Sequence, residues 1–273
     1  MNILVTLDKN YLKPLRIMLG SMFLNNPGEN FNIYIAADGI ESRDLHGLDR
    51  FRSGGSVHWH FVDVDESQFE DAPTLRYYSR AMYYRLLAAQ LLPEDVDKIL
   101  YLDPDILVIG KLRPLYETKM DGYLYAAAMH KGLTGVSAPI SKIRIPEHEA
   151  DSYFNSGVLL MNLKKIRQEV NPSDVFEYVR KHHQVLVLPD QDVLNGLYGT
   201  RILPLDESIW NYDARKFETY RLTSQGKADM DWTMHNTVIL HFCGKKKPWN
   251  AGYRGRFSSL YKHYQALADR CCE

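Results

Sequence analysis

Residues 2–37, NILVTLDKNYLKPLRIMLGSMFLNNPGENFNIYIAA, contain the clearest evidence of the fold class. Residues 2–7 form a short apolar run, which is typical of a buried strand. Residues 11–24 carry apolar side chains at helical spacing, namely Leu12, Leu15, Leu19, Met22 and Phe23. Residues 32–37 are again apolar and predict a second strand. The order strand, helix, strand is that of a βαβ unit, in which the two strands run parallel.

The same alternation continues along the chain. Helices are predicted at residues 41–52 and 77–91, the second one closed by Pro93, and strands at 56–62 and 98–102. This order predicts a single, doubly wound, mainly parallel sheet of the Rossmann-like α/β class, flanked by helices. Such sheets bind ligands beyond the carboxyl ends of their strands, so a site is expected at that edge.

The second half of the chain is less regular. Strands are predicted at residues 123–129, 157–163 and 237–242, and helices at 163–182 and 190–198. Residues 131–151 have mixed charge and two prolines and predict a long loop, a kind of segment that is often functional. We find neither an internal repeat nor a low-complexity linker. We therefore predict one domain at 1–250 with a C-terminal helical extension at 251–273.

The composition is that of an ordinary globular protein: of 273 residues, 45% are hydrophobic and 25% are charged, and the formal net charge is −1. This near-neutral charge argues against nucleic acid as a partner. The N-terminus lacks the basic segment of a signal peptide, and no apolar stretch approaches the roughly 18 residues of a membrane span. The three cysteines, with Cys271 and Cys272 adjacent, are not a disulfide framework. A reducing, cytoplasmic compartment is expected.

A candidate metal site is the pair of carboxylates in Asp103-Pro104-Asp105. Asp-x-Asp alone is a weak signal, because this chain has five such pairs. The context distinguishes this pair, since apolar residues 99–102 precede it and apolar residues 106–109 follow it. Carboxylates between two buried segments are costly unless they are compensated, and a divalent cation would compensate them. Pro104 suggests a bend that brings the two side chains together. The closest rival is Asp63/Asp65, which also follows a predicted strand.

A second candidate is His241-Phe242-Cys243-Gly244-Lys245-Lys246-Lys247-Pro248-Trp249, directly after the late strand. A neutral imidazole at His241 could be a third metal ligand, and a set of two carboxylates with one imidazole suits manganese better than magnesium or calcium, which prefer all-oxygen shells. Gly244 would let the backbone approach a phosphate, and the lysines would add positive charge. The alternatives are a hydrogen-bonded core histidine and a solvated lysine loop.

Four further segments place polar groups beside apolar runs. They are Asp8-Lys9-Asn10-Tyr11 after the first strand, Arg85 in the helix before Pro93, Tyr153-Phe154-Asn155-Ser156-Gly157-Val158, and Pro189-Asp190-Gln191-Asp192. Each has a purely structural alternative: Asn10 and Asp190 are good helix caps, and a helix arginine is normally a surface charge.

Taken together and in this order, these segments resemble glycosyltransferase family 8, which includes bacterial lipopolysaccharide galactosyl- and glucosyltransferases and the glycogenins. The resemblance extends from Asn2 to about Trp249. Its most specific parts are Lys98–Asp105, Tyr153–Leu163, Asp190–Asn195 and His241–Trp249.

The resemblance implies a GT-A fold, a UDP-sugar donor and a manganese ion, with magnesium as the alternative, that bridges the diphosphate. The matching metal ligands are Asp103, Asp105 and His241. Asp8 and Asn10 match positions near the uracil and ribose, and Gly244 and Lys247 match the diphosphate loop. Thr6 is also expected among the donor-binding residues. The positions that match the donor-sugar and catalytic group are Arg85, Asn155, Asp190 and Gln191.

The activity implied is retaining transfer of glucose or galactose, from UDP-glucose or UDP-galactose, to a hydroxyl of a glycan or lipid-linked acceptor of the cell envelope. The acceptor would attack the face from which UDP leaves, or a covalent intermediate would form on Asp190 or Gln191. Two positions depart from related bacterial enzymes: Thr6 stands at an alanine position, and His130 stands near an aspartate of the galactosyltransferase branch.

Two other functions stay open. One is a catalytically silent nucleotide-sugar-binding protein. The other is a metal-dependent phosphohydrolase, although Asp8 lacks the second acid two residues on that such enzymes use. The tail, Tyr253–Glu273, has apolar residues at helical spacing together with basic ones. It predicts either a helix packed on the domain or a weak peripheral contact at the inner face of the membrane.

Overall fold

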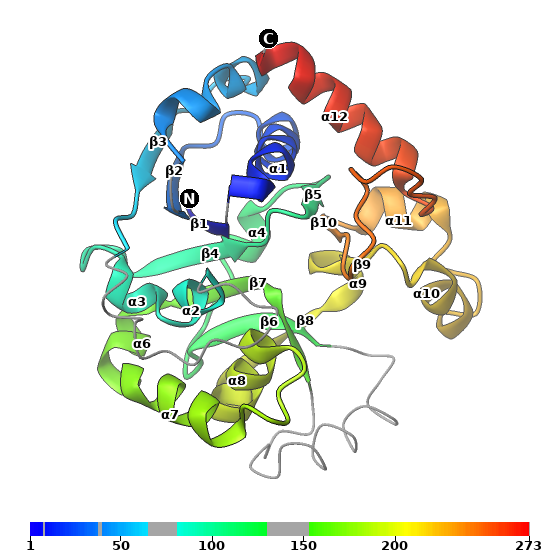
Figure 1. The fold of residues 1–273 in the computed structure, drawn as a ribbon. Coiled ribbons are helices and arrows are strands. Elements are labelled where there is room, and N and C mark those ends of the chain that lie inside the picture. Colours follow the sequence, from blue (N-terminus) through cyan, green and yellow to red (C-terminus); the bar gives the residue numbers. More distant parts are fainter. Residues whose placement is uncertain (8, 38–39, 65–80, 130–152, 273) are drawn as a thin grey trace.

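The computed structural model describes residues 1–7, 9–37, 40–64, 81–129 and 153–272 (Figure 1). The strands are β1 Asn2–Leu7, β2 Phe31–Ala37, β3 Val57–Phe61, β4 Lys98–Leu102, β5 Ile106–Val108, β6 Tyr125–Met129, β7 Phe154–Asn162, β8 Ile202–Asp206, β9 Tyr212–Asp213 and β10 Ile239–His241. The α-helices are α1 Leu12–Asn25, α2 Ala81–Leu86, α3 Ala88–Leu91, α4 Arg113–Tyr116, α6 Leu163–Glu169, α7 Pro172–His182, α8 Pro189–Tyr198, α9 Glu207–Trp210, α10 Phe217–Thr223, α11 Met230–Asn236 and α12 Ser258–Cys272. Short 3₁₀ helices lie at Lys9–Tyr11, Ser42–Leu45, Leu48–Phe51 and Gly199–Arg201.

The main sheet has seven strands in the order β3-β2-β1-β4-β7-β6-β8. The first four strands run parallel to one another, with Ile3 beside Ile33 on one side and Leu100 on the other. β7 is antiparallel to both of its neighbours, whereas β8 is parallel to β6. The predicted mainly parallel, doubly wound α/β sheet is therefore confirmed.

A second, smaller sheet has the order β5-β10-β9. β5 and β10 are antiparallel, and their register pairs His241 with Ile106. β9 runs parallel to β10 on its other side, with Asp213 beside His241. The apolar run at 237–242 predicts the late strand but not this separate sheet. The small sheet matters for the site, because it pairs His241 with Ile106, the residue that follows Asp105.

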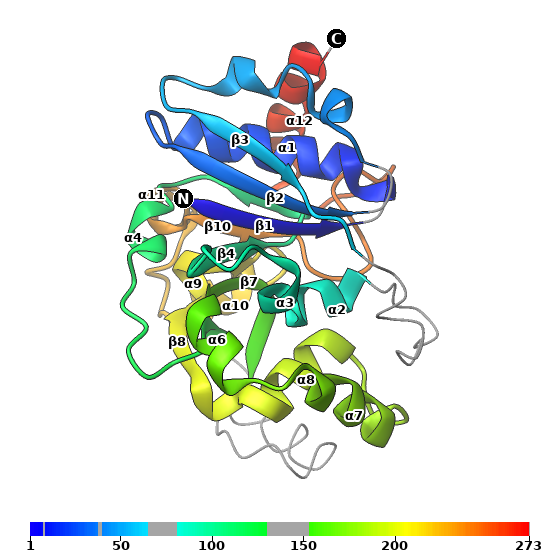
Figure 2. The same cartoon turned by 90° about the vertical axis from the view of Figure 1, so that its left-hand side faces the viewer.

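Helices cover both faces of the main sheet, as Figures 1 and 2 show. Alternate residues of each central strand point to opposite faces. In β1, Ile3 and Val5 pack with α1 and α12, whereas Leu4 packs with the helices of the other face, α2, α3, α6, α7 and α8. Because both faces are buried, the strands are continuous apolar runs rather than alternating ones. This explains why residues 2–7 are so uniformly apolar.

Three predicted helices differ in detail. Residues 41–52 form two 3₁₀ helices instead of one α-helix, because Gly47 between them takes the left-handed conformation at φ 88°. Residues 163–182 form α6 and α7, since Pro172 starts a new helix that Asn171 caps through the backbone N–H of Ser173. Within 77–91, the structure describes α2 and α3. Residues 77–80 and the whole predicted loop 131–151 lie outside the described residues.

The predicted tail helix is present as α12, and its apolar side faces inward. Phe257, Tyr261 and Ala268 are buried in the core that α1 also lines. Lys13 of α1 forms an ion pair with Asp269 at 3.3 Å. The packed-helix alternative therefore accounts for the apolar spacing of this segment. Among the described helices, none has the length and apolar character needed to cross a bilayer.

Arg167 in α6 connects two parts of the fold. Its guanidinium donates hydrogen bonds, 2.8–3.2 Å long, to backbone carbonyls around the end of α3, those of Ala89, Leu92, Pro93, Glu94 and Val96. We expect Arg167→Met to lower the free energy of unfolding by about 1–3 kcal/mol, because several carbonyls lose a charged donor together. Urea denaturation measures this loss. Arg270→Met, at an exposed residue of α12, is the control, and an equal effect in both variants would contradict the prediction.

Candidate functional site

Two carboxylates and one imidazole meet where the two sheets join. Asp103 follows β4 of the main sheet, Asp105 precedes β5 of the small sheet, and His241 ends β10. The Nε2 atom of His241 lies 3.2 Å from Oδ1 of Asp105 and 3.8 Å from Oδ2 of Asp103. One ligand atom from each of the three side chains lies within 4.8 Å of the others. The predicted convergence of these residues is thus present.

The backbone explains how neighbouring acids come to share one site. The amide of Asp103 donates to the carbonyl of Gly157 in β7 at 2.8 Å, while the carbonyl of Asp105 accepts from Phe242 after β10 at 3.0 Å. Each aspartate is therefore held by a different sheet. Pro104 lies at the corner between them, so the two carboxylates do not point to opposite faces as they would in a continuous strand.

Basic groups of the chain surround these acids. Arg85 NH1 lies 2.9 Å from Asp103 and 3.0 Å from Asp190, and the guanidinium stacks over the Tyr101 ring at 4.6 Å. The Tyr101 hydroxyl donates to Asp103. Lys247 forms an ion pair with Asp105 and donates to the carbonyl of Phe242 at 3.0 Å. The helix arginine of the sequence is therefore a residue of the site and not a surface charge.

The two carboxyl groups differ in acidity. Burial raises the pKa of Asp103, and Arg85 offsets only part of this effect. Burial acts in the same direction on Asp105, but His241 and Lys247 outweigh it and hold the pKa of Asp105 well below its ordinary value. Asp105 is thus ionised throughout the neutral range, as a cation ligand must be.

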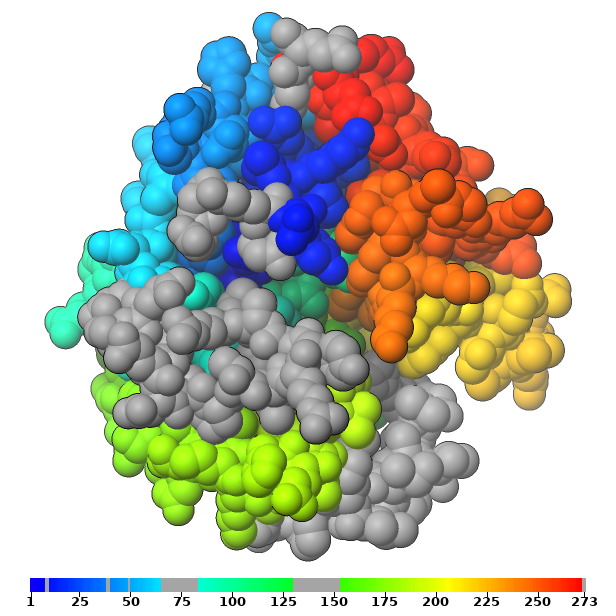
Figure 3. Space-filling model, viewed as in Figure 1, coloured from blue at the N-terminus to red at the C-terminus, as the bar shows by residue number. Residues whose placement is uncertain are grey.

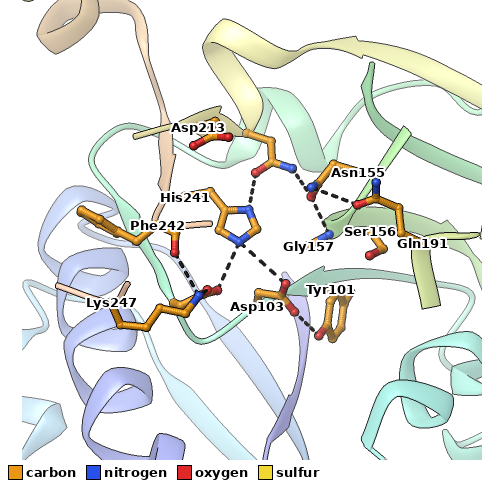
Figure 4. A network of polar contacts seen from close by, with 12 residues as sticks. Tyr101, Asp103, Asn155, Ser156, Gly157, Gln191, Asp213, His241, Phe242 and Lys247 are labelled. Carbon is orange, nitrogen blue, oxygen red and sulfur yellow. Dashed lines mark hydrogen bonds and ion pairs between the residues drawn. The ribbon is translucent and has the colours of Figure 1, made fainter. Parts of the chain in front are cut away.

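The donor set fits a divalent cation of the manganese type. It combines two carboxylates with an imidazole whose Nε2 faces both of them (Figure 4). Gly157 leaves room for this arrangement, because a Cβ atom there would lie 2.4 Å from Cε1 of His241 and 2.7 Å from Oδ2 of Asp103. Asp103, Asp105 and His241 are therefore the residues that could hold such an ion.

The other predicted sugar residues lie next to this group. Asp190 and Gln191 are in the first turn of α8. Ser156 donates to Asp190 at 2.8 Å, and Asn155 donates to Gln191 at 3.2 Å. The capping alternative for Asp190 does not hold, because it is Asp192 that accepts from the backbone N–H groups of Val187 and Leu188. Asp190 instead points toward Arg85.

Only some of the residues predicted to bind the nucleoside lie in the described part of the chain. Asp8 lies outside the described residues, as does His130, while Asn10 is exposed in the short helix after β1. Thr6 bonds to the Tyr101 hydroxyl at 3.2 Å. The ring of Tyr11 contacts that of Trp249 edge-on at 5.6 Å. On the face drawn in Figure 3, the N-terminal segment accordingly lies beside the segment that precedes α12.

The predicted diphosphate loop follows β10. Gly244 has φ 85°, a left-handed conformation that favours glycine. A Cβ at Gly244 would lie 2.5 Å from NH1 of Arg215, so this arginine approaches the loop closely. Buried Asp213 holds the guanidinium of Arg215 with two hydrogen bonds of 2.9 and 2.7 Å from Nε and NH2. Arg215 thus places its guanidinium, paired with Asp213, beside Gly244 in this loop.

The rival Asp-x-Asp pairs have other surroundings. Asp63, Asp95 and Asp97 are exposed, and Asp65 lies outside the described residues. Asp229 caps α11 by accepting from the backbone N–H of Trp232 at 2.8 Å. Within the part of the chain that the structure describes, the acids at 103 and 105 are the ones that meet a histidine.

Sequence reasoning missed five residues of this site: Tyr101, Ser156, Gly157, Asn211 and Arg215. A signal existed for Tyr101, because it lies two residues before Asp103 on the same side of β4. Gly157 and Ser156 lie inside a segment that was singled out for Asn155. Asn211 and Arg215 carry no spacing signal, since both lie in connections between short elements.

The similarity of the chain to known proteins identifies its family. Residues 2–252 match the family model described as Glycosyl transferase family 8. The chain belongs to glycosyl transferase family 8. This confirms the resemblance drawn from the sequence and makes the chain a glycosyltransferase.

Several bacterial proteins are similar to this family 8 chain. It is 27% identical to general stress protein A of Bacillus subtilis over 273 residues, which covers 97% of this chain and 93% of the relative. It is 28% identical to a lipopolysaccharide 1,2-glucosyltransferase of Escherichia coli K12 over 251 residues, covering 92% and 73%. A lipopolysaccharide 1,3-galactosyltransferase of Salmonella typhimurium is 23% identical over 252 residues, again covering 92% and 73%.

Solved structures place the family 8 chain in the GT-A fold. The galactosyltransferase LgtC, in complex with donor and acceptor sugar analogues, superposes with a TM-score of 0.78 and is 26% identical, covering 98% of this chain and 96% of that one. The GlyE glycosyltransferase of Streptococcus pneumoniae has the same fold, with a TM-score of 0.71. The predicted GT-A fold is therefore confirmed.

Proposed function

We propose that this protein transfers a hexose, glucose or galactose, from a UDP-sugar to a hydroxyl group of a glycan or lipid-linked acceptor of the cell envelope, with retention of the anomeric configuration. The observation that carries the proposal is the meeting of Asp103, Asp105 and His241 beside Asp190 and Arg85. Two relatives named as a lipopolysaccharide glucosyltransferase and a lipopolysaccharide galactosyltransferase support this class of donor and acceptor.

The cation in this proposal is Mn²⁺, with Mg²⁺ as the alternative, held by Asp103, Asp105 and His241. When bound, it would neutralise negative charge on the departing diphosphate. Lys247, whose ammonium group already lies at Asp105, would add a second positive charge there. Gly244 would let the backbone approach the phosphates, and Asn10, Thr6 and Asp8 would bind the nucleoside.

The donor sugar would lie between α8 and β7. Asp190 and Gln191 would accept hydrogen bonds from its hydroxyls, while Asn155 and Arg85 keep these two side chains in place. Asp190 is held by Arg85 at 3.0 Å and by Ser156 at 2.8 Å. These contacts lower the nucleophilicity of Asp190 and so favour attack by the acceptor hydroxyl on the face from which UDP leaves over a covalent intermediate on Asp190. In this attack the hydroxyl would give its proton to a phosphate oxygen of the departing UDP.

A thermal-shift panel of nucleotide sugars, with and without Mn²⁺, tests the donor and the cation together. We expect UDP-glucose or UDP-galactose to stabilise the protein only when the cation is present, by about 2.7 kcal/mol at a concentration 100 times the dissociation constant. GDP-sugars are the control for the base. Equal stabilisation in the presence of a chelator would contradict the proposed cation site.

Turnover separates this function from its two alternatives. The transferase should release UDP slowly from its donor in the presence of Mn²⁺, because water replaces the acceptor. A silent nucleotide-sugar-binding protein would be stabilised by the same donor without releasing UDP. A phosphohydrolase would release inorganic phosphate from a phosphomonoester instead.

The setting of the reaction is also part of the proposal. A lipid-linked acceptor would bring the enzyme to the inner face of the membrane in the cytoplasm. Exposed Arg254, Lys262 and Arg270 in the segment 251–273 support a weak electrostatic contact there, since the apolar side of α12 is buried. The division into a catalytic domain at 1–250 and this extension stays a prediction.

A further inference from the structure

A chain of side-chain amides leads from the sugar end of the site to His241 (Figure 4). Asn155 donates to Gln191, Asn211 lies between Asn155 and His241, and the ring of His241 faces the two acids. Asn211 is 3% exposed and His241 is 5% exposed. Buried polar groups of this kind need defined partners, so the direction of every hydrogen bond in the chain can be worked out.

The direction is set at Gly157. Its backbone N–H can only donate, and it lies 2.8 Å from one side-chain atom of Asn155. That atom must therefore be the carbonyl oxygen Oδ1 of Asn155. The same oxygen lies 2.7 Å from the Asn211 side chain, which must present its Nδ2 group as the donor.

The orientation of Asn211 then determines the tautomer of His241. With Nδ2 turned to Asn155, the carbonyl oxygen Oδ1 of Asn211 faces Nδ1 of His241 at 2.8 Å. A carbonyl only accepts, so Nδ1 carries the proton. The lone pair of the neutral ring is consequently on Nε2, the atom that lies 3.2 Å from Asp105 and 3.8 Å from Asp103.

We propose that Asn211 is a positioning residue that fixes the His241 ring in the Nδ1–H tautomer, with Nε2 directed at the cation bound by Asp103 and Asp105. This inference rests on the proposed cation site and extends it to a residue that does not touch the cation. A second partner of this kind both orients a metal-binding imidazole and makes it more basic.

The amide chain also links cation binding to the sugar end. Asn155 Oδ1 receives two hydrogen bonds, from Gly157 and Asn211, while its Nδ2 group donates to Gln191 at 3.2 Å. A substitution at Asn211 therefore removes a hydrogen bond that Asn155 accepts, and Asn155 is the residue that holds Gln191. For this reason the test measures cation binding to the protein alone and does not depend on sugar transfer.

The experiment compares Asn211→Leu and Asn211→Asp by calorimetric titration with Mn²⁺. Leucine removes the acceptor for Nδ1–H at similar size, so we expect cation affinity to fall about 10- to 100-fold. Aspartate keeps an oxygen opposite Nδ1, and we expect it to retain the affinity of the wild type within a few-fold, even though it loses the bond to Asn155.

The matched control is Asn26→Leu. Asn26 is a buried amide far from the site, and it bonds to Met22, Gly110 and Leu112. Its loss should lower the unfolding temperature in the presence of a chelator at least as much as Asn211→Leu does, while Mn²⁺ affinity stays unchanged.

The outcomes distinguish the positioning role of Asn211 from the cation site on which it rests. Asn211→Leu with wild-type affinity, or equal weakening by leucine and aspartate, overturns the positioning role and leaves the cation site intact. Wild-type protein that shows no Mn²⁺ binding overturns the cation site and the positioning role together. Selective loss with leucine, with rescue by aspartate, supports both.

Discussion

Replacing Asp103 or Asp105 by asparagine is expected to reduce Mn²⁺-dependent release of UDP from its sugar donor by at least about 100-fold. Removing a residue that hydrogen-bonds to a metal ligand commonly lowers metal affinity or activity by about 10- to 100-fold. Removing the charge of the ligand itself is expected to cost more. Both acids lie within ligand distance of His241. Asp105→Asn would also leave Lys247 without its carboxylate partner, and Asp103→Asn would leave Arg85 with Asp190 alone.

The measurement is UDP release at saturating Mn²⁺, together with urea denaturation to show that each variant is folded. Asp97→Asn is the matched control, because Asp97 belongs to another Asp-x-Asp pair but is exposed and outside the site. If Asp103→Asn and Asp105→Asn both kept near-normal release while remaining folded, these acids would not be cation ligands.

Gly157→Ala is expected to impair cation binding although no ligand is changed. The added Cβ would lie 2.4 Å from His241 Cε1, 2.7 Å from Asp103 Oδ2 and 3.0 Å from Asn155 Oδ1. These side chains must move apart, and overpacking of this kind costs about 1–3 kcal/mol. If all of that strain falls on the cation complex, Mn²⁺ affinity falls by about 5- to 150-fold.

Gly20→Ala provides the matched control for this substitution. A Cβ at Gly20 would lie 3.1 Å from the Phe51 ring, in the packing between α1 and the 3₁₀ helix Leu48–Phe51. It should affect stability and leave Mn²⁺ affinity unchanged. Titration calorimetry of both variants decides the matter, and wild-type affinity in Gly157→Ala would show that the ligands rearrange without cost.

The acids of the site were predictable because their local surroundings are unusual. Apolar residues on both sides of Asp103-Pro104-Asp105 indicated carboxylates between buried strands, and exposed pairs such as Asp95/Asp97 lack that setting. Arg85 was harder, because a helix arginine is normally solvated. Only the packing of α2 against the main sheet brings its guanidinium to Asp103 and Asp190.

The role of Asn211 could not be predicted from a sequence pattern. It lies between α9 and β9, in neither an apolar run nor a motif, and its role depends on side chains from β7 and β10. The helix predicted at 41–52 shows the same limit at the level of the fold. The backbone conformation of Gly47 divides this segment into two short 3₁₀ helices.

The residues alone were enough to predict the parallel βαβ half of the sheet and the kinds of side chain available for the site. Both follow from local periodicity, since apolar spacing distinguishes strand from helix and a charge between buried segments demands a partner. The tertiary structure decided that β7 runs antiparallel to β4, and that β5 pairs with β10 in the register that brings His241 next to Asp105. Strand partners far apart in the chain are selected by the packing of the whole core, and no local pattern records that choice.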